Sequence, residues 1–263
     1  MFTLACAGGW LKEANEEKFA AAAKLGFKAV EILGWVNMDL AKARANIDAS
    51  GCALSAILVQ SRDEHKQSLI ANTHGIVHED AHGAFVAAIT ETLETAKTLA
   101  CTKIVVTTGN ERTDVSRQTQ QDNIVKALKA AANVVEGSGV DLVLEPLNVL
   151  VDHKGYYLTT TAQGIEIIKT VNSPQVKLLY DVYHQQITEG NIINTIRENI
   201  GYIGHIHIGD VPGRKEPGTG EINYKNVFKA IADTGYSEYV ALECGLSEDV
   251  ETVCEKMWDL AAS

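Results

Sequence analysis

The chain has 263 residues, of which 46% are apolar and only four are proline, so it can bury one large core. Its 23 basic and 34 acidic residues give a net charge of -11, which disfavours nucleic acid or an anionic membrane surface as a partner. The N-terminal MFTLACAGGW lacks the pattern of a signal peptide and no stretch reaches the length of a membrane span, so we expect a soluble, cytoplasmic protein.

Short apolar segments alternate with helical patterns along the chain, as is typical of βαβ units around a parallel sheet. Most of the helical segments carry apolar residues at i, i+3 and i+4. The predicted strands cover residues 2–7, 28–33, 53–60, 102–109, 140–148, 176–184, 203–210 and 239–245. The predicted helices cover residues 15–27, 39–51, 83–100, 120–139, 161–173, 191–202, 223–236 and 249–260.

Eight strands, each followed by a helix, predict an α/β fold in which residues 1–263 form a single-domain (β/α)₈ TIM barrel. An open, doubly wound sheet is disfavoured because no GxGxxG turn follows the first strand. No low-complexity stretch divides the chain into parts. In such barrels the catalytic groups lie at the carboxyl ends of the strands, so the titratable residues there are the candidates for a site.

The last four predicted strands each carry a possible metal ligand at the carboxyl end. These residues are Glu145, Asp181, His207 and Glu243. Each alone is typical of a helix cap or an ion pair, but four matching strand ends converge on one centre. Three carboxylates without a cation would repel one another and raise one another's pKa values. An oxygen-rich set with one imidazole favours one divalent ion, Mn²⁺, Mg²⁺ or Co²⁺, over a structural zinc.

The segment HIGDVPGRKEPGTGEINYKNVFKAI closely resembles the signature of hydroxypyruvate isomerases, and EPLN, YDVYHQQ and LECG resemble other site motifs of that family. The resemblance extends from about Val140 to the end of the chain. It implies a xylose isomerase-like barrel in which the four residues above bind the metal ion. It also implies that Glu145 and Glu243 form the acid/base pair, and that the chain forms a dimer or a tetramer.

A metal ion that holds two adjacent substrate oxygens polarises the carbonyl group and makes the neighbouring C–H more acidic. One carboxylate then removes a proton, and a second handles the other proton transfer through an enediolate. Return of the proton to the neighbouring carbon gives isomerisation, whereas return to the same carbon from the other face gives epimerisation. The chemistry of two glutamates therefore supports both outcomes.

Two positions help to distinguish a hydroxypyruvate isomerase from a ketose 3-epimerase. His207 stands where those enzymes usually carry glutamine, whereas ketose 3-epimerases of the same superfamily carry histidine. The acidic residue that epimerases place six positions after their first ligand is Val151 here. We therefore expect a hydroxypyruvate isomerase-like enzyme acting on a small hydroxy-carbonyl substrate, with a tagatose or allulose 3-epimerase-like activity as the alternative. A non-catalytic sugar-binding protein is a weaker alternative, since mere recognition does not need two glutamates at a metal centre.

Two further residues are candidates for contacts with the substrate. The family resemblance suggests that His184 touches a substrate oxygen, the alternative being a loop histidine bonded to backbone. Arg214, in a Gly/Pro-rich loop, can bind a substrate carboxylate or a pair of hydroxyls, the alternative being a solvated loop charge. His205 points to the same face as His207 one layer deeper, so we expect a buried, hydrogen-bonded side chain. Glu31 lies near the end of the second predicted strand, where it can contact the substrate or a neighbouring helix, and we take it as a structural residue.

The stretch NTHGIVHEDAHGAF carries three histidines at four-residue spacing, His74, His78 and His82. On one helix face this spacing would resemble a stripe of metal ligands. Gly75 and Gly83 interrupt the pattern, and the stretch falls in the long connection after the third strand. We therefore expect a mobile loop that borders the site and carries helix-capping residues, rather than a ligand cluster.

Overall fold

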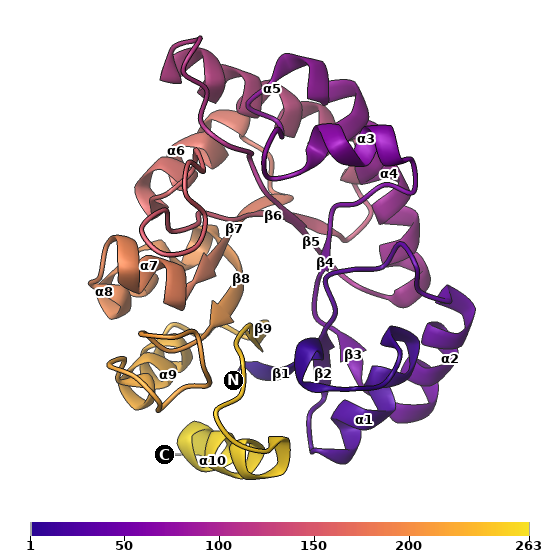
Figure 1. Cartoon of the computed structure of the whole chain (residues 1–263), viewed down its shortest axis with the longest axis vertical. Helices are drawn as coiled ribbons and strands as arrows, with labels where there is room; N and C mark the ends of the chain where they lie inside the picture. The colour runs from indigo at the N-terminus through magenta and orange to yellow at the C-terminus, as the bar shows by residue number, and fades with distance from the viewer. Residues whose placement is uncertain (1, 263) are drawn as a thin grey trace.

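The structure is a computed structural model that describes residues 2–262. Its strands are all parallel to their neighbours and ring the centre of the molecule, with the helices outside them (Figure 1). The strands are β1 (Thr3–Ala7), β2 (Ala29–Glu31), β3 (Ala53–Leu54), β4 (Ile57–Leu58), β5 (Lys103–Val106), β6 (Asp141–Leu144), β7 (Val176–Asp181), β8 (Ile203–Ile208) and β9 (Tyr239–Leu242). Their order in the sheet is β3-β2-β1-β9-β8-β7-β6-β5-β4.

The two ends of this order, β3 and β4, are parts of one predicted strand, residues 53–60. On one side of the segment, the Leu58 amide donates to the carbonyl oxygen of Leu33 beyond β2, at 2.9 Å. On the other side, the Val59 amide donates to the carbonyl oxygen of Val105 in β5, at 3.0 Å. The chain between β3 and β4 therefore joins the ends of the sheet. The predicted (β/α)₈ barrel is confirmed, with its third strand in two pieces.

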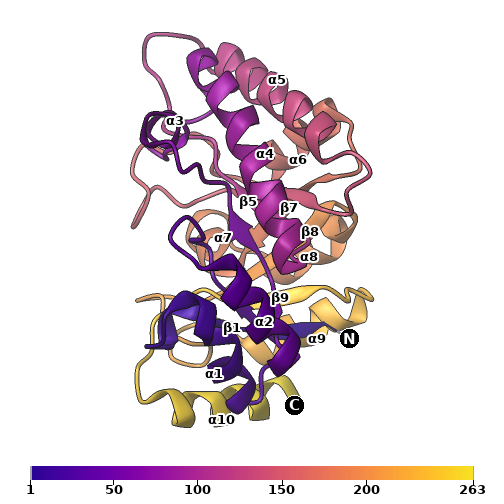
Figure 2. The same cartoon turned by 90° about the vertical axis from the view of Figure 1, so that its right-hand side faces the viewer.

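The α-helices are α1 (Lys18–Lys24), α2 (Leu40–Ser50), α3 (Glu64–Ile70), α4 (His82–Leu99), α5 (Arg117–Val135), α6 (Thr161–Val171), α7 (Val182–Thr188), α8 (Ile192–Asn199), α9 (Tyr224–Asp233) and α10 (Val250–Ala262). Short 3₁₀ turns are η1 (Gly8–Trp10), η2 (Asn15–Glu17), η3 (Glu79–Ala81) and η4 (Ile200–Tyr202). Figure 2 shows the helices packed along the outside of the strands. Within residues 2–262, no helix is long and apolar enough to cross a membrane.

Two helices, α3 and α7, are absent from the sequence prediction. The predicted strand 176–184 is too long by three residues, because the chain turns into α7 directly after Asp181. Oδ1 of Asp181 accepts hydrogen bonds from the backbone amides of Tyr183 and His184, at 2.8 and 3.3 Å. These bonds satisfy amides at the start of the helix, so Asp181 acts as its N-cap.

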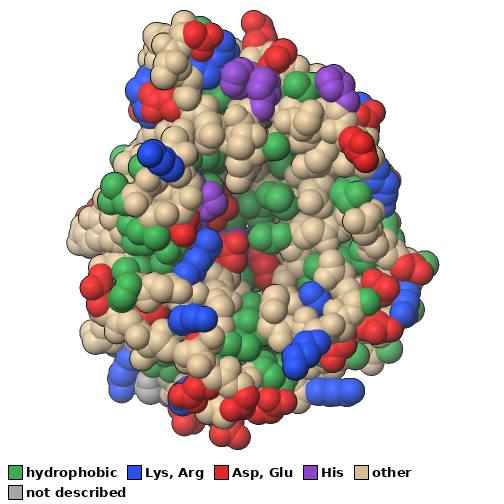
Figure 3. Space-filling model, viewed as in Figure 1, with side chains coloured by type: hydrophobic (Ala, Val, Ile, Leu, Met, Phe, Trp, Pro, Cys, Tyr) green, Lys and Arg blue, Asp and Glu red, His purple; other side chains and the backbone are tan. Residues whose placement is uncertain are grey.

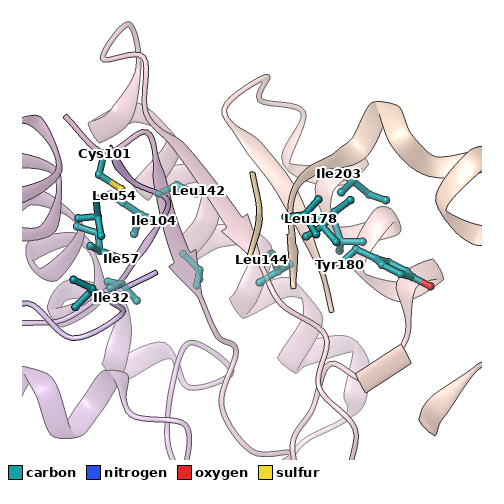
Figure 4. Packing of buried hydrophobic residues seen from close by; sticks show 14 of the residues in the cluster. Ile32, Leu54, Ile57, Cys101, Ile104, Leu142, Leu144, Leu178, Tyr180 and Ile203 are labelled. Carbon is teal, nitrogen blue, oxygen red and sulfur yellow. The ribbon is translucent and has the colours of Figure 1, made fainter. Parts of the chain in front are cut away.

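Side chains alternate between the outside and the inside of the barrel along each strand. Leu142 and Leu144 of β6 belong to the large apolar cluster between strands and helices (Figure 4), and Val143 between them belongs to a separate small cluster. That inner cluster consists of Ala56, Val105, Val143 and Leu179. Apolar side chains thus fill the interior below the strand ends. The next inward position on β6 is Glu145.

Candidate functional site

The inward positions of four neighbouring strands bring the predicted metal ligands together. Glu145 follows β6, Asp181 ends β7, His207 lies in β8 and Glu243 follows β9, with Asp181 paired to His207 in the sheet. One nitrogen or oxygen atom of each lies within 4.8 Å of those of the other three. Figure 3 shows acidic, basic and histidine side chains gathered in the central hollow of this face. The structure therefore assembles the four predicted ligands at one point.

Two atoms of this centre lack a hydrogen-bond partner among the described residues. They are Oε1 of Glu145 and Nδ1 of His207, and both are shielded from solvent. They lie 3.5 Å apart, and the same Nδ1 lies 2.8 Å from Oε2 of Glu243. Buried polar atoms normally have partners, so an inward-facing pair without a protein partner is suited to binding a cation. The donor set of three carboxylates and one imidazole nitrogen fits a hard or borderline divalent ion.

The surroundings push the pKa values of the two glutamates apart. Burial raises the pKa of Glu145, and the negative charge of Glu243 adds to this increase, although the positive charge of His207, 3.5 Å away, opposes it. Burial also raises the pKa of Glu243, but the positive charges of His207 and Arg214 outweigh burial, so this pKa is lowered. Two carboxyl groups with separated pKa values are typical of acid/base sites.

Glu31 in β2 holds His207 from the opposite side. Its Oε1 lies 2.7 Å from Nε2 of His207, and Nε2 of His205 lies 3.3 Å from both carboxylate oxygens. The hydroxyl of Ser55 donates to the same carboxylate. Because a carboxylate only accepts, Nε2 of His207 donates to Glu31, and Nδ1 is the nitrogen that faces the centre. The expectation of a buried, hydrogen-bonded His205 agrees with the structure, and the contact of Glu31 with His207 was not predicted from the sequence.

His184 reaches the same centre from α7. Its Nδ1 accepts hydrogen bonds from the backbone and side-chain amides of Asn148, at 3.3 and 2.7 Å. The proton therefore lies on Nε2, which is 3.4 Å from Oδ2 of Asp181 and has no hydrogen-bond partner among the described residues. A buried donor directed at the centre can bind a substrate oxygen, as the sequence suggested.

Arg214 lies over the centre and is already engaged there. Its Nη2 is 2.8 Å from Oε2 of Glu243 and 3.3 Å from Oδ2 of Asp181, and its Nε donates to the carbonyl oxygen of Glu243 at 3.3 Å. The guanidinium also stacks on the ring of Tyr183, 4.9 Å from its centroid. No hydrogen bond or ion pair within residues 2–262 uses Nη1. Arg214 thus neutralises two predicted ligands and retains one donor group for a substrate.

A family model described as a xylose isomerase-like TIM barrel matches residues 19–256. The chain belongs to this family. It is 33% identical over 228 residues to the 2-oxo-tetronate isomerase of Cupriavidus necator, covering 86% of this chain and 85% of that one. It is 31% identical over 237 residues to the hydroxypyruvate isomerase of Escherichia coli K12, covering 86% of each.

Among solved structures, that of D-psicose 3-epimerase with D-tagatose from Clostridium cellulolyticum H10 has a TM-score of 0.79. Its sequence identity is 22%, and the match covers 99% of this chain and 98% of that one. This likeness shows a shared fold. The names of the curated relatives support the sequence prediction of an isomerase, so this member of the family is an isomerase.

The loop that carries Arg214 is held by buried acidic residues that the sequence reasoning missed. Oδ1 of Asp210 accepts from the amide of Ile222 at 3.1 Å, and Oδ2 accepts from the amide of Gly218 at 2.8 Å. Glu216 accepts from the amide and hydroxyl of a serine beyond β9. Arg214 itself has a φ of 50°, a left-handed conformation that needs such support. The sequence signal that could have identified Asp210 and Glu216 is the group of charged residues in the segment GDVPGRKEPG.

A second missed residue is Asp152, in the loop after β6. Val151, the position compared with epimerases, has 67% of its surface exposed. Asp152 instead accepts a hydrogen bond from the side chain of Asn148 at 3.0 Å, and Asn148 in turn contacts His184. This chain of contacts orients His184. Asp152 therefore supports the site, and it lies one residue after Val151, the position at which epimerases carry an acidic residue.

The histidine-rich stretch does not form the helical stripe that its spacing suggested. The rings of His74 and His78 stack with their centroids 3.8 Å apart, and Asp80 joins them rather than His82. Both histidines lie in the connection between α3 and α4, and His82 is the first residue of α4. The structure therefore brings His74 and His78 together with Asp80 and leaves His82 apart, an arrangement that the four-residue spacing did not predict.

Proposed function

We propose that the chain interconverts a small hydroxy-aldehyde and hydroxy-ketone acid, in the manner of a hydroxypyruvate isomerase. The observation that carries the proposal is the pairing of two glutamates from different strands, Glu145 and Glu243, at one centre beneath Arg214. The names of the curated relatives, hydroxypyruvate isomerase and 2-oxo-tetronate isomerase, support this class of substrate.

Four residues of the chain would hold one divalent ion, Mn²⁺, Mg²⁺ or Co²⁺: Glu145, Asp181, His207 and Glu243. Such an ion supplies a Lewis acid that polarises the substrate carbonyl and stabilises negative charge on the substrate oxygens. The protein fixes its ligands in advance, because Asp181 is bonded to two backbone amides and His207 to Glu31. The site is therefore preorganised for binding and for orientation.

The two glutamates supply the proton transfers. One carboxylate removes the proton from the substrate carbon next to the carbonyl, and the electron pair of that C–H bond forms the double bond of an enediolate. The other carboxylate serves the transfer between the substrate oxygens, and the abstracted proton returns to the neighbouring carbon. His184 donates from Nε2 to a substrate oxygen, and its bond with Asn148 keeps the proton on that nitrogen.

The charge of the site favours an acidic substrate. Arg214 offers a free donor group to a carboxylate from above the centre. A cavity of about 320 Å³ opens beside Glu243 and is also lined by Glu31, Gly9 and Lys18. The preference for a three- or four-carbon acid rests on Arg214 and on the names of the curated relatives, not on the volume of this cavity.

A substrate panel in the presence of Mn²⁺ tests this proposal. The panel runs from hydroxypyruvate and 2-oxo-tetronate through neutral tetruloses to ketohexoses, with proton exchange into deuterated water as a second readout. We expect the acids to have the highest kcat/KM. Efficient epimerisation of ketohexoses with no turnover of the acids would replace this function with the ketose 3-epimerase alternative, which His207 favours over the glutamine usual in hydroxypyruvate isomerases.

Replacing Arg214 with alanine should damage the reaction of an acidic substrate selectively. A charge-assisted contact to the carboxylate is lost, so kcat/KM for the acid should fall by roughly 2–4 kcal/mol, about 30- to 1000-fold. The substitution also breaks the ion pair between Arg214 and Glu243, and any loss of activity from that change should affect acidic and neutral substrates equally. The measurement is therefore the ratio of kcat/KM values for an acid and a neutral ketose, with Arg214→Lys as the control. An unchanged ratio would mean that Arg214 does not bind the carboxylate.

Replacing Glu31 with glutamine should weaken metal binding. The amide of glutamine has the same shape, but it no longer fixes the proton of His207 on Nε2, and loss of such a partner costs about 10- to 100-fold in affinity. Calorimetric titration with Mn²⁺ measures the effect, and thermal unfolding of the metal-free protein reports any structural damage. The control variant is Glu189→Gln. Among the described residues, the carboxylate of Glu189 accepts a hydrogen bond from the amide of Thr161 and takes no part in the centre, so the affinity for Mn²⁺ should not change.

A further inference from the structure

A second cluster of metal-binding side chains lies outside the catalytic groups, between α3 and α4. It consists of His74, His78 and Asp80, whose nitrogen and oxygen atoms lie within 4.8 Å of one another. Nε2 of His74 is 2.9 Å from Oδ1 of Asp80, and the two imidazole planes differ by 13°. We propose that this cluster binds a late first-row transition-metal ion, with Zn²⁺ as the representative, independently of the catalytic centre.

The backbone that carries these side chains is fixed to the barrel. The amide of Val77 donates to the carbonyl oxygen of Thr108 at 3.0 Å, and the side chain of Asn123 in α5 donates to the carbonyl oxygen of Val77 at 2.9 Å. Gly109 allows the close approach, because a Cβ there would lie 2.0 Å from the carbonyl oxygen of His74. The ligand groups therefore project from an anchored segment, which lowers the entropy cost of binding an ion.

The protonation states of the cluster suit a cation. Burial lowers the pKa of His78, and the neighbouring His74 and Arg112 lower it further, so its imidazole is neutral near pH 7. The hydrogen bond from His74 lowers the pKa of Asp80, which keeps its carboxylate ionised. The charge of Arg112 is balanced by Asp114, 2.6 Å away. An ion here would meet the neutral imidazole of His78 and the negative carboxylate of Asp80.

The donor set selects the class of ion. Two imidazoles and one carboxylate match the nitrogen and oxygen ligands of Zn²⁺ and its neighbours, whereas Mg²⁺ and Ca²⁺ prefer sets made of oxygen alone. His74 has 29% and Asp80 has 66% of its side chain exposed, so solvent can supply a fourth ligand. The two ring planes are nearly parallel, so at least one imidazole must rotate before both nitrogens can bind one ion.

The cluster lies at the catalytic end of the barrel. It packs on Thr108, just beyond β5, and the amide of Thr108 donates to the hydroxyl of Tyr156, which donates to the carbonyl oxygen of Glu145. Figure 3 shows histidine side chains side by side on the face that contains the central hollow. An ion bound to His74 and His78 would therefore clamp the connection between α3 and α4 at the rim of the site.

Titration of the chelator-stripped protein with Zn²⁺, followed by calorimetry, tests the proposal. We expect that His74→Ala combined with His78→Ala removes one bound Zn²⁺ per chain, and that Asp80→Asn weakens the same site at least tenfold. All three side chains are partly or largely exposed, so folding should persist. The matched control is His65→Ala, an exposed histidine of α3, which should leave the number of bound ions unchanged.

The variant Glu243→Gln distinguishes Zn²⁺ bound at His74 and His78 from Zn²⁺ bound at the catalytic centre. In that background the ion at His74 and His78 should remain, and its loss on adding the two alanine substitutions supports the proposal even if the proposed function fails. NMR spectra should show the imidazole signals of both histidines shifting with the first equivalents of Zn²⁺. An unchanged Zn²⁺ count in the double alanine variant would overturn the proposal, and so would an equal loss in the His65→Ala control.

Discussion

Removal of the divalent ion should abolish turnover, and Mn²⁺, Co²⁺ or Mg²⁺ should restore it. Without an ion, Oε1 of Glu145 and Nδ1 of His207 face the centre without a hydrogen-bond partner among the described residues. Arg214 is then the cation that balances Asp181 and Glu243, with contacts of 3.3 and 2.8 Å. The hydrogen-bond donors at the centre, Nε2 of His184 and Nη1 of Arg214, polarise a carbonyl less strongly than a divalent ion does, so the chemical step should stop.

Metal binding should also stabilise the folded chain, because the ligand residues converge only after folding. An ion at a concentration of 100 times its Kd adds about 2.7 kcal/mol to the free energy of unfolding, which raises Tm by several degrees. Thermal unfolding with and without Mn²⁺ measures this change. Asp181→Asn removes one ligand and should reduce the shift. Full turnover by a sample shown to be free of metal would contradict the assignment.

The four predicted ligands were accessible to sequence reasoning because side chains alternate strictly along a strand. Val143 and Leu179 point into the barrel, so Glu145 and Asp181, two positions later, must do so as well. The carboxyl ends of parallel strands lie at one edge of the sheet, so their convergence can be predicted without knowing the loops. This part of the site depends only on local periodicity and on closure of the barrel.

The contact of Glu31 with His207 was not predicted because it depends on how strands meet across the barrel. It lies 176 residues from His207 in the sequence, and β2 and β8 are separated in the sheet by β1 and β9. No local pattern encodes such a pairing. A single glutamate at a strand end is then indistinguishable from one that bonds a neighbouring helix. The contact follows only when the diameter of the barrel is known.

Local propensity also misplaced the end of the strand that carries Asp181. The residues after Asp181 are valine and tyrosine, which favour strands, yet the capping bonds of Asp181 start α7 there. In the cluster of His74 and His78, spacing was weighed only as a helical pattern. A turn in the connection brings Asp80 within reach instead, and such turns depend on contacts with other strands.

Glu145→Gln or Glu243→Gln should lower kcat by at least about 100-fold, the usual scale for loss of a positioned acid or base. Glutamine keeps the shape of the side chain but takes no proton at the pH of catalysis. Oε1 of Glu145 has no hydrogen-bond partner among the described residues, so the substitution breaks no bond there and the fold should persist. Steady-state rates at saturating Mn²⁺ and proton exchange into deuterated water measure the loss.

Because both glutamates are also predicted metal ligands, bound Mn²⁺ must be quantified in the same samples. A variant that binds the ion but exchanges no substrate proton has lost the base, whereas one that recovers when Mn²⁺ is raised has lost only affinity. Glu189→Gln, a glutamate outside the centre, should keep wild-type rates. If Glu145→Gln or Glu243→Gln keeps the wild-type rate with metal bound, that residue transfers no proton and the scheme with two glutamates is wrong.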